Sequence, residues 1–113
     1  MGFQLNFSID EVEKKLIVRL DGRLDAVTTS ILEKKIHTLI AENHTHILLD
    51  FLHIDYLSSA GLRLLLATTK ALRAKKGALI LFSIDDEVME IIKLAGFEKV
   101  LHICSTEQEA LRV

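Results

Sequence analysis

Several residue types that mark particular classes of protein are missing or rare in this sequence of 113 residues. It has no proline and no tryptophan, and its one cysteine, Cys104, leaves no internal disulfide to form, as is usual in a reducing compartment. No apolar run approaches the roughly 20 residues that span a membrane. Residues 1–10 alternate between apolar and polar side chains, so we expect no signal peptide. These absences predict a cytoplasmic protein without a membrane span.

The charge balance argues against nucleic acid as a direct partner. The formal net charge is −2, and the densest basic cluster is the short RAKK at 73–76. Domains that bind nucleic acid usually gather an excess of Lys and Arg on one face. Half of the residues are hydrophobic, which is enough for one core in a chain of this length, so residues 1–113 are predicted to form a single domain.

The hydrophobic pattern predicts an α/β fold. Alternating apolar residues at 3–9, beginning with Phe3, and at 16–20 indicate an opening antiparallel hairpin, whose second strand we expect to break at Gly22. Strand-length apolar runs then alternate with helical patterns, which implies parallel crossovers. We expect a mixed sheet of about four to five strands and about four helices, with helices near 28–42, 59–75, 85–95 and 106–113, and strands near 47–52, 78–84 and 99–104.

Two residues are expected to end helices in the left-handed conformation. Asn43 follows the helix predicted at 28–42, and asparagine tolerates a positive φ. Gly77 follows the basic last turn of the helix predicted at 59–75, where glycine is the usual residue at C′.

The segment HIDYLSS at 53–59 is the most informative for function. We expect it to be a loop at the carboxyl end of a parallel strand, where open α/β sheets place their sites. Ser58 is predicted to cap the following helix. Ser59 would then be the first helical residue, beside free N–H groups and the positive end of the helix dipole, which suits a phosphate. Ser59 is therefore the first candidate for phosphorylation, and Ser58 is the second.

Other chemistry finds little support in the sequence. A serine hydrolase needs G-x-S-x-G, and Leu57 stands where the first glycine would be. His37, His44 and His46 lack a cysteine or carboxylate that would complete a recognised metal spacing. The two glycine-rich motifs that bind nucleotide phosphates, G-x-G-x-x-G and G-x-x-x-x-G-K-[ST], do not occur. We expect no catalytic residue, no metal and no cofactor.

Three more residues are candidates for binding a partner protein. Asp25 and Asp55 are most simply turn carboxylates with local hydrogen bonds, but Asp25 could orient the Ser59 hydroxyl or touch a partner if it faces the same end of the sheet. The helix predicted at 59–75 also has a small or basic face, made of Arg63, Ala67, Lys70 and Ala74. Apolar residues of the same helix, such as Leu64, extend beyond one core stripe, and this broad apolar surface indicates either a partner surface or a helix that is more deeply buried.

Over essentially its whole length, the sequence resembles the STAS domain, and within it the bacterial anti-sigma factor antagonists. The resemblance rests on three stretches, LIVRLDGRLDA, HILLDFLHIDYLSSAGLRLLL and EVMEIIKLAGFEKVLHICSTEQEAL. In the family, the serine or threonine two residues before a Gly-Leu pair accepts the phosphate, which points to Ser59 ahead of Gly61. Ser58 stands where many members have Asp, and Asp25 matches the acidic residue of the G-x-L-D turn.

The resemblance implies a binding protein and not an enzyme. The unphosphorylated form would bind an anti-sigma factor that is also a serine kinase, and the sigma factor would be released. Phosphorylation at Ser59 would dissolve the complex, and a separate phosphatase would reset it. Asp25, Asp55, Ser58, Ser59 and Arg63 would then face the partner. The alternative is a scaffold subunit of a stress-signalling or lipid-transport complex that uses the same fold without phosphorylation.

Overall fold

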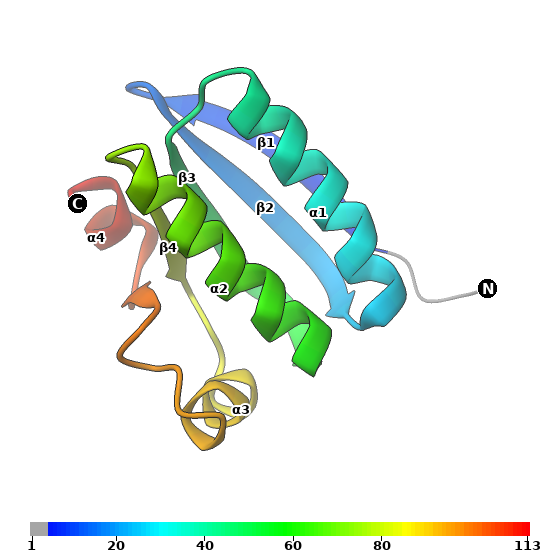
Figure 1. Ribbon diagram of the computed structural model, residues 1–113. Helices are drawn as coiled ribbons and strands as arrows, with labels where there is room; N and C mark the ends of the chain where they lie inside the picture. Colours follow the sequence, from blue (N-terminus) through cyan, green and yellow to red (C-terminus); the bar gives the residue numbers. More distant parts are fainter. Residues whose placement is uncertain (1–4) are drawn as a thin grey trace.

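The computed structural model describes residues 5–113, and over them the chain forms one mixed sheet with helices on both faces (Figure 1). The strands are β1 (Asn6–Val12), β2 (Lys15–Leu24), β3 (His46–Leu57), β4 (Ala78–Phe82) and β5 (His102–Cys104), side by side in that order. The helices are α1 (Ala26–Ala41), α2 (Ser59–Ala74), α3 (Asp86–Leu94) and α4 (Glu107–Leu111). β1 and β2 are antiparallel, and the other neighbours are parallel. Within this range no helix is long and apolar enough to cross a membrane.

The predicted opening hairpin is confirmed. β1 and β2 are joined by a tight turn at Glu13 and Lys14, whose φ angles of 51° and 72° match the primed turns that suit the strand twist. Phe3, which began the predicted alternation, lies outside the described residues.

The predicted break at Gly22 is wrong. β2 continues through Gly22, which has a φ of 137°, and ends at Leu24. The register shifts here, because Gly22 and Leu24 of β2 are two residues apart while their partners Ile54 and Leu57 of β3 are three apart. The extra residue is therefore in β3, and β2 continues opposite it.

β3 is longer than predicted and replaces the expected loop. Instead of ending at residue 52, it runs to Leu57, and only Ser58 separates it from α2. Its last buried residues, Phe51, Ile54 and Leu57, are three apart and do not alternate. A register shift against β2 interrupts the pleat there, so the sequence does not show the alternation of apolar and polar residues that identifies a strand.

Two hydrophobic clusters hold the sheet between its helices. α1 and α2 pack on one face (Figure 1), and the main cluster on that side includes Leu32 and Ile36 of α1, Leu65 and Leu72 of α2, and Val88 and Ile92 of α3. The short α4 covers part of the opposite face, where Ala110 joins a second cluster with Ile17, Leu48, Ile80 and Phe82. Both faces of the central strands are therefore buried, as their continuous apolar runs predicted.

A single arginine connects four elements on the α4 side of the sheet. Arg19 of β2 bonds to Asp10 of β1 at 2.8 Å, to Asp50 of β3 at 2.9 Å and to Glu107 of α4 at 2.8 Å. The hydrogen bonds that the guanidinium donates to Glu107 and, next in effect, to Asp10 raise its pKa. This network orients α4 on the sheet and leaves the other face to the candidate site.

The helix ends show one confirmed prediction and one correction. Asn43 has a φ of 71° and ends α1 as expected. At the end of α2, however, Lys76 takes the left-handed conformation with a φ of 61°, one residue before the glycine predicted for it. Gly77 is needed for a different reason, because a Cβ there would lie 1.9 Å from the backbone oxygen of Thr45.

Candidate functional site

The starts of α1 and α2 lie side by side at the carboxyl ends of β2 and β3 (Figure 1). Leu24 and Leu57, which end these strands, are paired in the register. The Ser58 N–H also donates to the Leu24 carbonyl at 2.9 Å. Asp25 and Ser59 therefore face the same end of the sheet, which was the condition set for Asp25 to take part in the site.

The two serines have different environments. Ser58 is the N-cap of α2, as predicted, and its hydroxyl accepts a hydrogen bond from the Gly61 N–H at 3.2 Å. Ser59 is exposed at the first helical position, and its hydroxyl has no hydrogen bond within residues 5–113. Over the same range, the N–H groups of Ser59 and Ala60 also lack acceptors, as expected for the first turn of a helix. An anion on Ser59 would meet these N–H groups and the positive end of the dipole.

Asp25 has a structural role at the start of α1. Its Oδ1 accepts from the N–H groups of Val27 at 3.0 Å and Thr28 at 2.9 Å, while the Thr28 hydroxyl accepts from the Asp25 N–H, which completes a capping box. The Thr28 N–H, followed by the Thr28 hydroxyl, lowers the pKa of the Asp25 carboxyl. Asp25 is thus ionised beside the start of α2, but within the described chain it does not bond to the Ser59 hydroxyl.

A contact between β2 and β3 adds two residues that the sequence analysis missed. The Arg23 guanidinium lies 4.5 Å from the centre of the Tyr56 ring, in the range of a cation–π contact. Arg23 Nε is also 3.7 Å from Asp25 Oδ2. Only the register of β2 against β3 brings these side chains together, and a single sequence gives no signal for that register. Asp55 is exposed on β3, two residues before the strand ends.

The helix α2 has both a broad buried side and an exposed outer face. Leu64 is buried and lines a groove of about 320 Å³ between α1 and α2, so packing on α1 accounts for part of the pattern. The predicted outer face is nevertheless exposed, as its members Arg63, Ala67, Lys70 and Ala74 show. Arg63 therefore points away from the core, one turn along α2 from Ser59.

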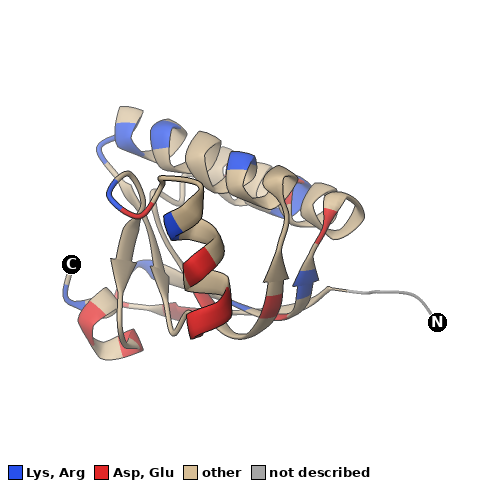
Figure 2. Cartoon of the chain, turned by 90° about the horizontal axis from the view of Figure 1, so that it is seen from below, with Lys and Arg blue, Asp and Glu red and all other residues tan. Residues whose placement is uncertain are grey.

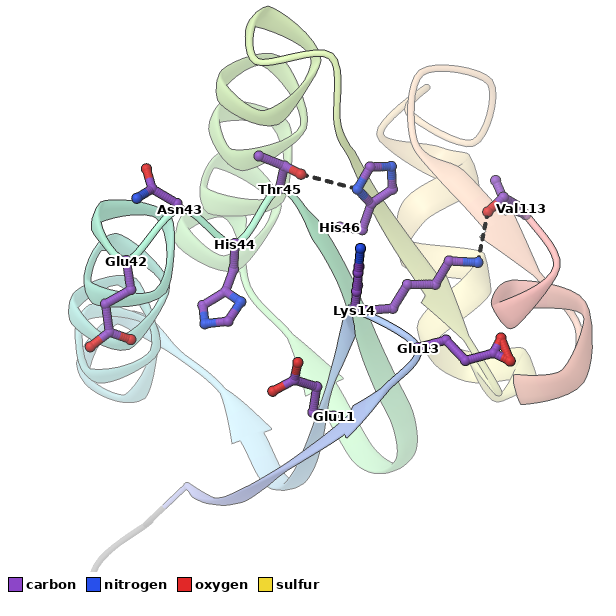
Figure 3. Close-up of a pocket in the computed structure, with 10 residues that line it drawn as sticks. Glu11, Glu13, Lys14, Glu42, Asn43, His44, Thr45, His46 and Val113 are labelled. Atoms are coloured by element: carbon purple, nitrogen blue, oxygen red, sulfur yellow. Dashed lines mark hydrogen bonds between the residues drawn. The ribbon is translucent and has the colours of Figure 1, made fainter.

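A second, larger cavity of about 530 Å³ lies at the other end of the strands, beside the β1–β2 turn (Figure 3). His44 and His46 line it, with the His46 Nδ1 3.1 Å from the Thr45 hydroxyl, but His37 does not. Across residues 5–113, no group of three or more His, Cys, Asp or Glu side chains is placed to hold a metal. This cavity is remote from Ser59, and the three histidines do not form one site.

The fold and the site together define a class of protein. A mixed sheet opens with a hairpin, and two capped helices begin next to each other at the carboxyl ends of its central strands, where they present a serine on the surface. The STAS domain family matches residues 6–110 of this chain. The chain belongs to the STAS domain family.

Relatives with known descriptions agree on one kind of regulator. BtrV of Bordetella bronchiseptica, provisionally named an anti-sigma factor antagonist, is 27% identical over 106 residues and is aligned over 94% of this chain and 91% of its own length. RsfB of Mycobacterium tuberculosis, an anti-sigma-F factor antagonist, is 29% identical over 98 residues, which are 84% of this chain and 77% of RsfB.

A solved relative confirms the fold. The anti-sigma factor antagonist SpoIIAA in its unphosphorylated form superposes with a TM-score of 0.79 at 27% identity, over 94% of this chain and 93% of its own. The phosphorylated form, from Bacillus, gives a TM-score of 0.71 at 25% identity, over 95% of this chain and 97% of its own. The resemblance inferred from the sequence is confirmed, and the fold is the one that was predicted. These relatives are regulatory binding proteins.

Proposed function

We propose that this chain is an anti-sigma factor antagonist that is switched by phosphorylation of Ser59. The unphosphorylated chain binds an anti-sigma factor that is also a serine kinase, and the sigma factor is thereby released. The observation that carries this proposal is the difference between the two serines. The Ser58 hydroxyl is engaged in capping α2, whereas the Ser59 hydroxyl is exposed beside free N–H groups.

The chemistry of the switch belongs to the partners. The kinase transfers the γ-phosphoryl group of ATP to the Ser59 oxygen, ADP leaves, and the hydroxyl proton is released. A phosphatase later hydrolyses the ester with water, which restores the hydroxyl and frees inorganic phosphate. The chain supplies an accessible acceptor at a helix start that tolerates a doubly charged group.

The position of Ser59 explains how one modification can dissolve a complex. Asp25, Asp55, Ser58, Ser59 and Arg63 are the proposed contact residues at the carboxyl ends of the strands. A phosphate adds a charge of about −1.5 to −2 beside the two carboxylates, and that charge would have to be desolvated against the partner. Because about 1.4 kcal/mol is a tenfold change in affinity, a small loss at this interface is sufficient. The relative SpoIIAA, solved in phosphorylated and unphosphorylated forms, supports the proposal.

Phosphorylation of this chain by kinase-type anti-sigma factors tests the proposal. The chain is incubated with ATP and each candidate, its intact mass is measured, and the modified residue is mapped by peptide fragmentation. We expect one phosphoryl group on the parent chain and on Ser58→Ala, and none on Ser59→Ala. Ser58→Ala removes a helix cap worth about 1 kcal/mol, so its fold is checked by circular dichroism beforehand.

Two results would contradict the proposal. A phosphoryl group that persists on Ser59→Ala would move the switch to another residue. An absence of phosphorylation by every candidate, with a folded chain, would favour the alternative of a scaffold subunit in a stress-signalling or lipid-transport complex. Copurification with such an assembly would then identify it.

A further inference from the structure

Arg63 is an exposed cation without a fixed partner next to the proposed switch. It makes no ion pair within residues 5–113. α2 itself offers none, because this helix carries Arg63, Lys70 and Arg73 but no acidic residue, whereas α3 begins with Asp86 and Glu87 (Figure 2). The exposed face of α2 therefore carries positive charge, and Arg63 is its cation nearest in the helix to Ser59, so Arg63 suits an acidic group from another molecule.

The groove between α1 and α2 adjoins Arg63 and offers space beside it for another molecule. Thr29 of α1 and Arg63 of α2 both line it. Thr29 is 6% exposed, and its hydroxyl has no hydrogen-bond partner among the described residues. Because the hydroxyl oxygen itself is buried, the exposed guanidinium of Arg63 is the group of this lining that an acidic group of another molecule can reach. Glu33 on the α1 wall does not pair with Arg63, which leaves the guanidinium available.

We propose that an acidic segment of the partner is seated in the α1–α2 groove and that Arg63 binds one of its carboxylates. When Ser59 is phosphorylated, Arg63 forms an ion pair with the phosphate in place of that carboxylate. This inference rests on the proposed function and adds a mechanism to it. Phosphorylation then acts in two ways. It removes the Arg63 cation from the interface by an ion pair within the chain, and it repels acidic groups of the partner.

Helix geometry favours this exchange. Ser59 and Arg63 are four residues apart on α2, so their side chains are neighbours on the helix surface. An acidic group four residues before a basic one is the better of the two orders for such pairs. A phosphate also offers several oxygens to the planar fork of a guanidinium, which gives a stronger pair than a single carboxylate contact.

The capture of Arg63 can be measured without any partner. Phosphoserine is incorporated at position 59, and the ionisation of the phosphate is followed by ³¹P NMR in the parent chain, in Arg63→Gln and in Lys70→Gln. Lys70→Gln is the matched control, since it removes the same charge from the same exposed face three turns from the phosphate. We expect the phosphate to ionise about 0.3 pH unit higher in Arg63→Gln and at the parent value in Lys70→Gln. Equal midpoints in all three proteins would overturn the capture.

The contribution to partner binding is measured by a double-mutant cycle. The probe is the anti-sigma factor that phosphorylates the chain, used without ATP against chains with serine or phosphoserine at position 59. We expect Arg63→Gln alone to weaken binding about tenfold. Phosphorylation lowers the affinity for the anti-sigma factor in both chains, and we expect the fold-decrease in Arg63→Gln to be about three times smaller than in the parent.

The two arms separate the inference from the function on which it rests. If phosphorylation weakens binding equally in the parent and in Arg63→Gln, the switch exists but does not act through Arg63. If no anti-sigma factor binds or modifies the chain, the proposed function fails. The NMR comparison still decides whether Arg63 forms an ion pair with a phosphate on Ser59.

Discussion

At the start of α2, two adjacent serines have different roles. Ser58 holds the helix end and Ser59 leaves its hydroxyl exposed, so a modification of Ser59 does not break the cap that positions it. The sequence predicted both roles, because a hydroxyl just before a helical pattern is a common N-cap and the next residue is then N1. Asp25 illustrates the limit of such reasoning. Its turn position was evident, but its capping box depends on the conformation of Thr28.

Asp25 gives a prediction about pH at the residue scale. The capping hydrogen bonds hold the pKa of its carboxyl lower in the folded chain than its ordinary value of about 3.9 in the unfolded chain. Its contribution to stability is therefore complete above the unfolded value and is lost as the pH falls through the folded value. Asp25→Asn keeps a good cap but does not titrate. Its free energy of unfolding should therefore fall less between pH 7 and pH 3 than that of the parent. Urea unfolding at pH 7 and pH 3 measures this, and an identical loss of stability in both proteins would contradict it.

Among the elements, β3 shows best what a single sequence conceals. Its first half was predicted because apolar residues are continuous there. Its second half, from His53 to Leu57, was interpreted as a loop because the buried residues are spaced by three and polar residues lie between them. The bulges against β2 that produce this spacing are long-range features, and so is the contact between Arg23 and Tyr56. The position of the site at the carboxyl ends of the strands was still predicted, because the order of elements determines it.

The end of α2 gives a prediction at the element scale. Gly77→Ala would push a Cβ against the backbone of Thr45, and we expect the free energy of unfolding to fall by about 2 kcal/mol. Lys76→Gly is the matched control, because Lys76 and not Gly77 has the left-handed φ of this end. It should raise the free energy of unfolding by about 0.5 kcal/mol. Chemical denaturation compares the three proteins, and a Gly77→Ala protein as stable as the parent would refute the close approach.

On the scale of the whole molecule, the fold separates stability from function. The Arg19 network and α4 lie on one face of the sheet, and the serine pair and the α1–α2 groove lie where α1 and α2 begin on the other. The acidic start of α3 and the basic surface of α2 give the molecule an uneven charge (Figure 2), although its net charge is small. Composition alone could not reveal this separation, since it depends on which helix each charge occupies.

The central claim is that the chemical state of Ser59 controls binding of a partner protein. Isothermal titration calorimetry tests it most directly, with the anti-sigma factor that modifies the chain titrated against four forms: the parent, Ser59→Ala, Ser59→Asp and the chain phosphorylated at Ser59. We expect Ser59→Ala to bind as tightly as the parent, and the phosphorylated chain and Ser59→Asp to bind at least about tenfold more weakly. Equal affinity of all four forms would contradict the claim.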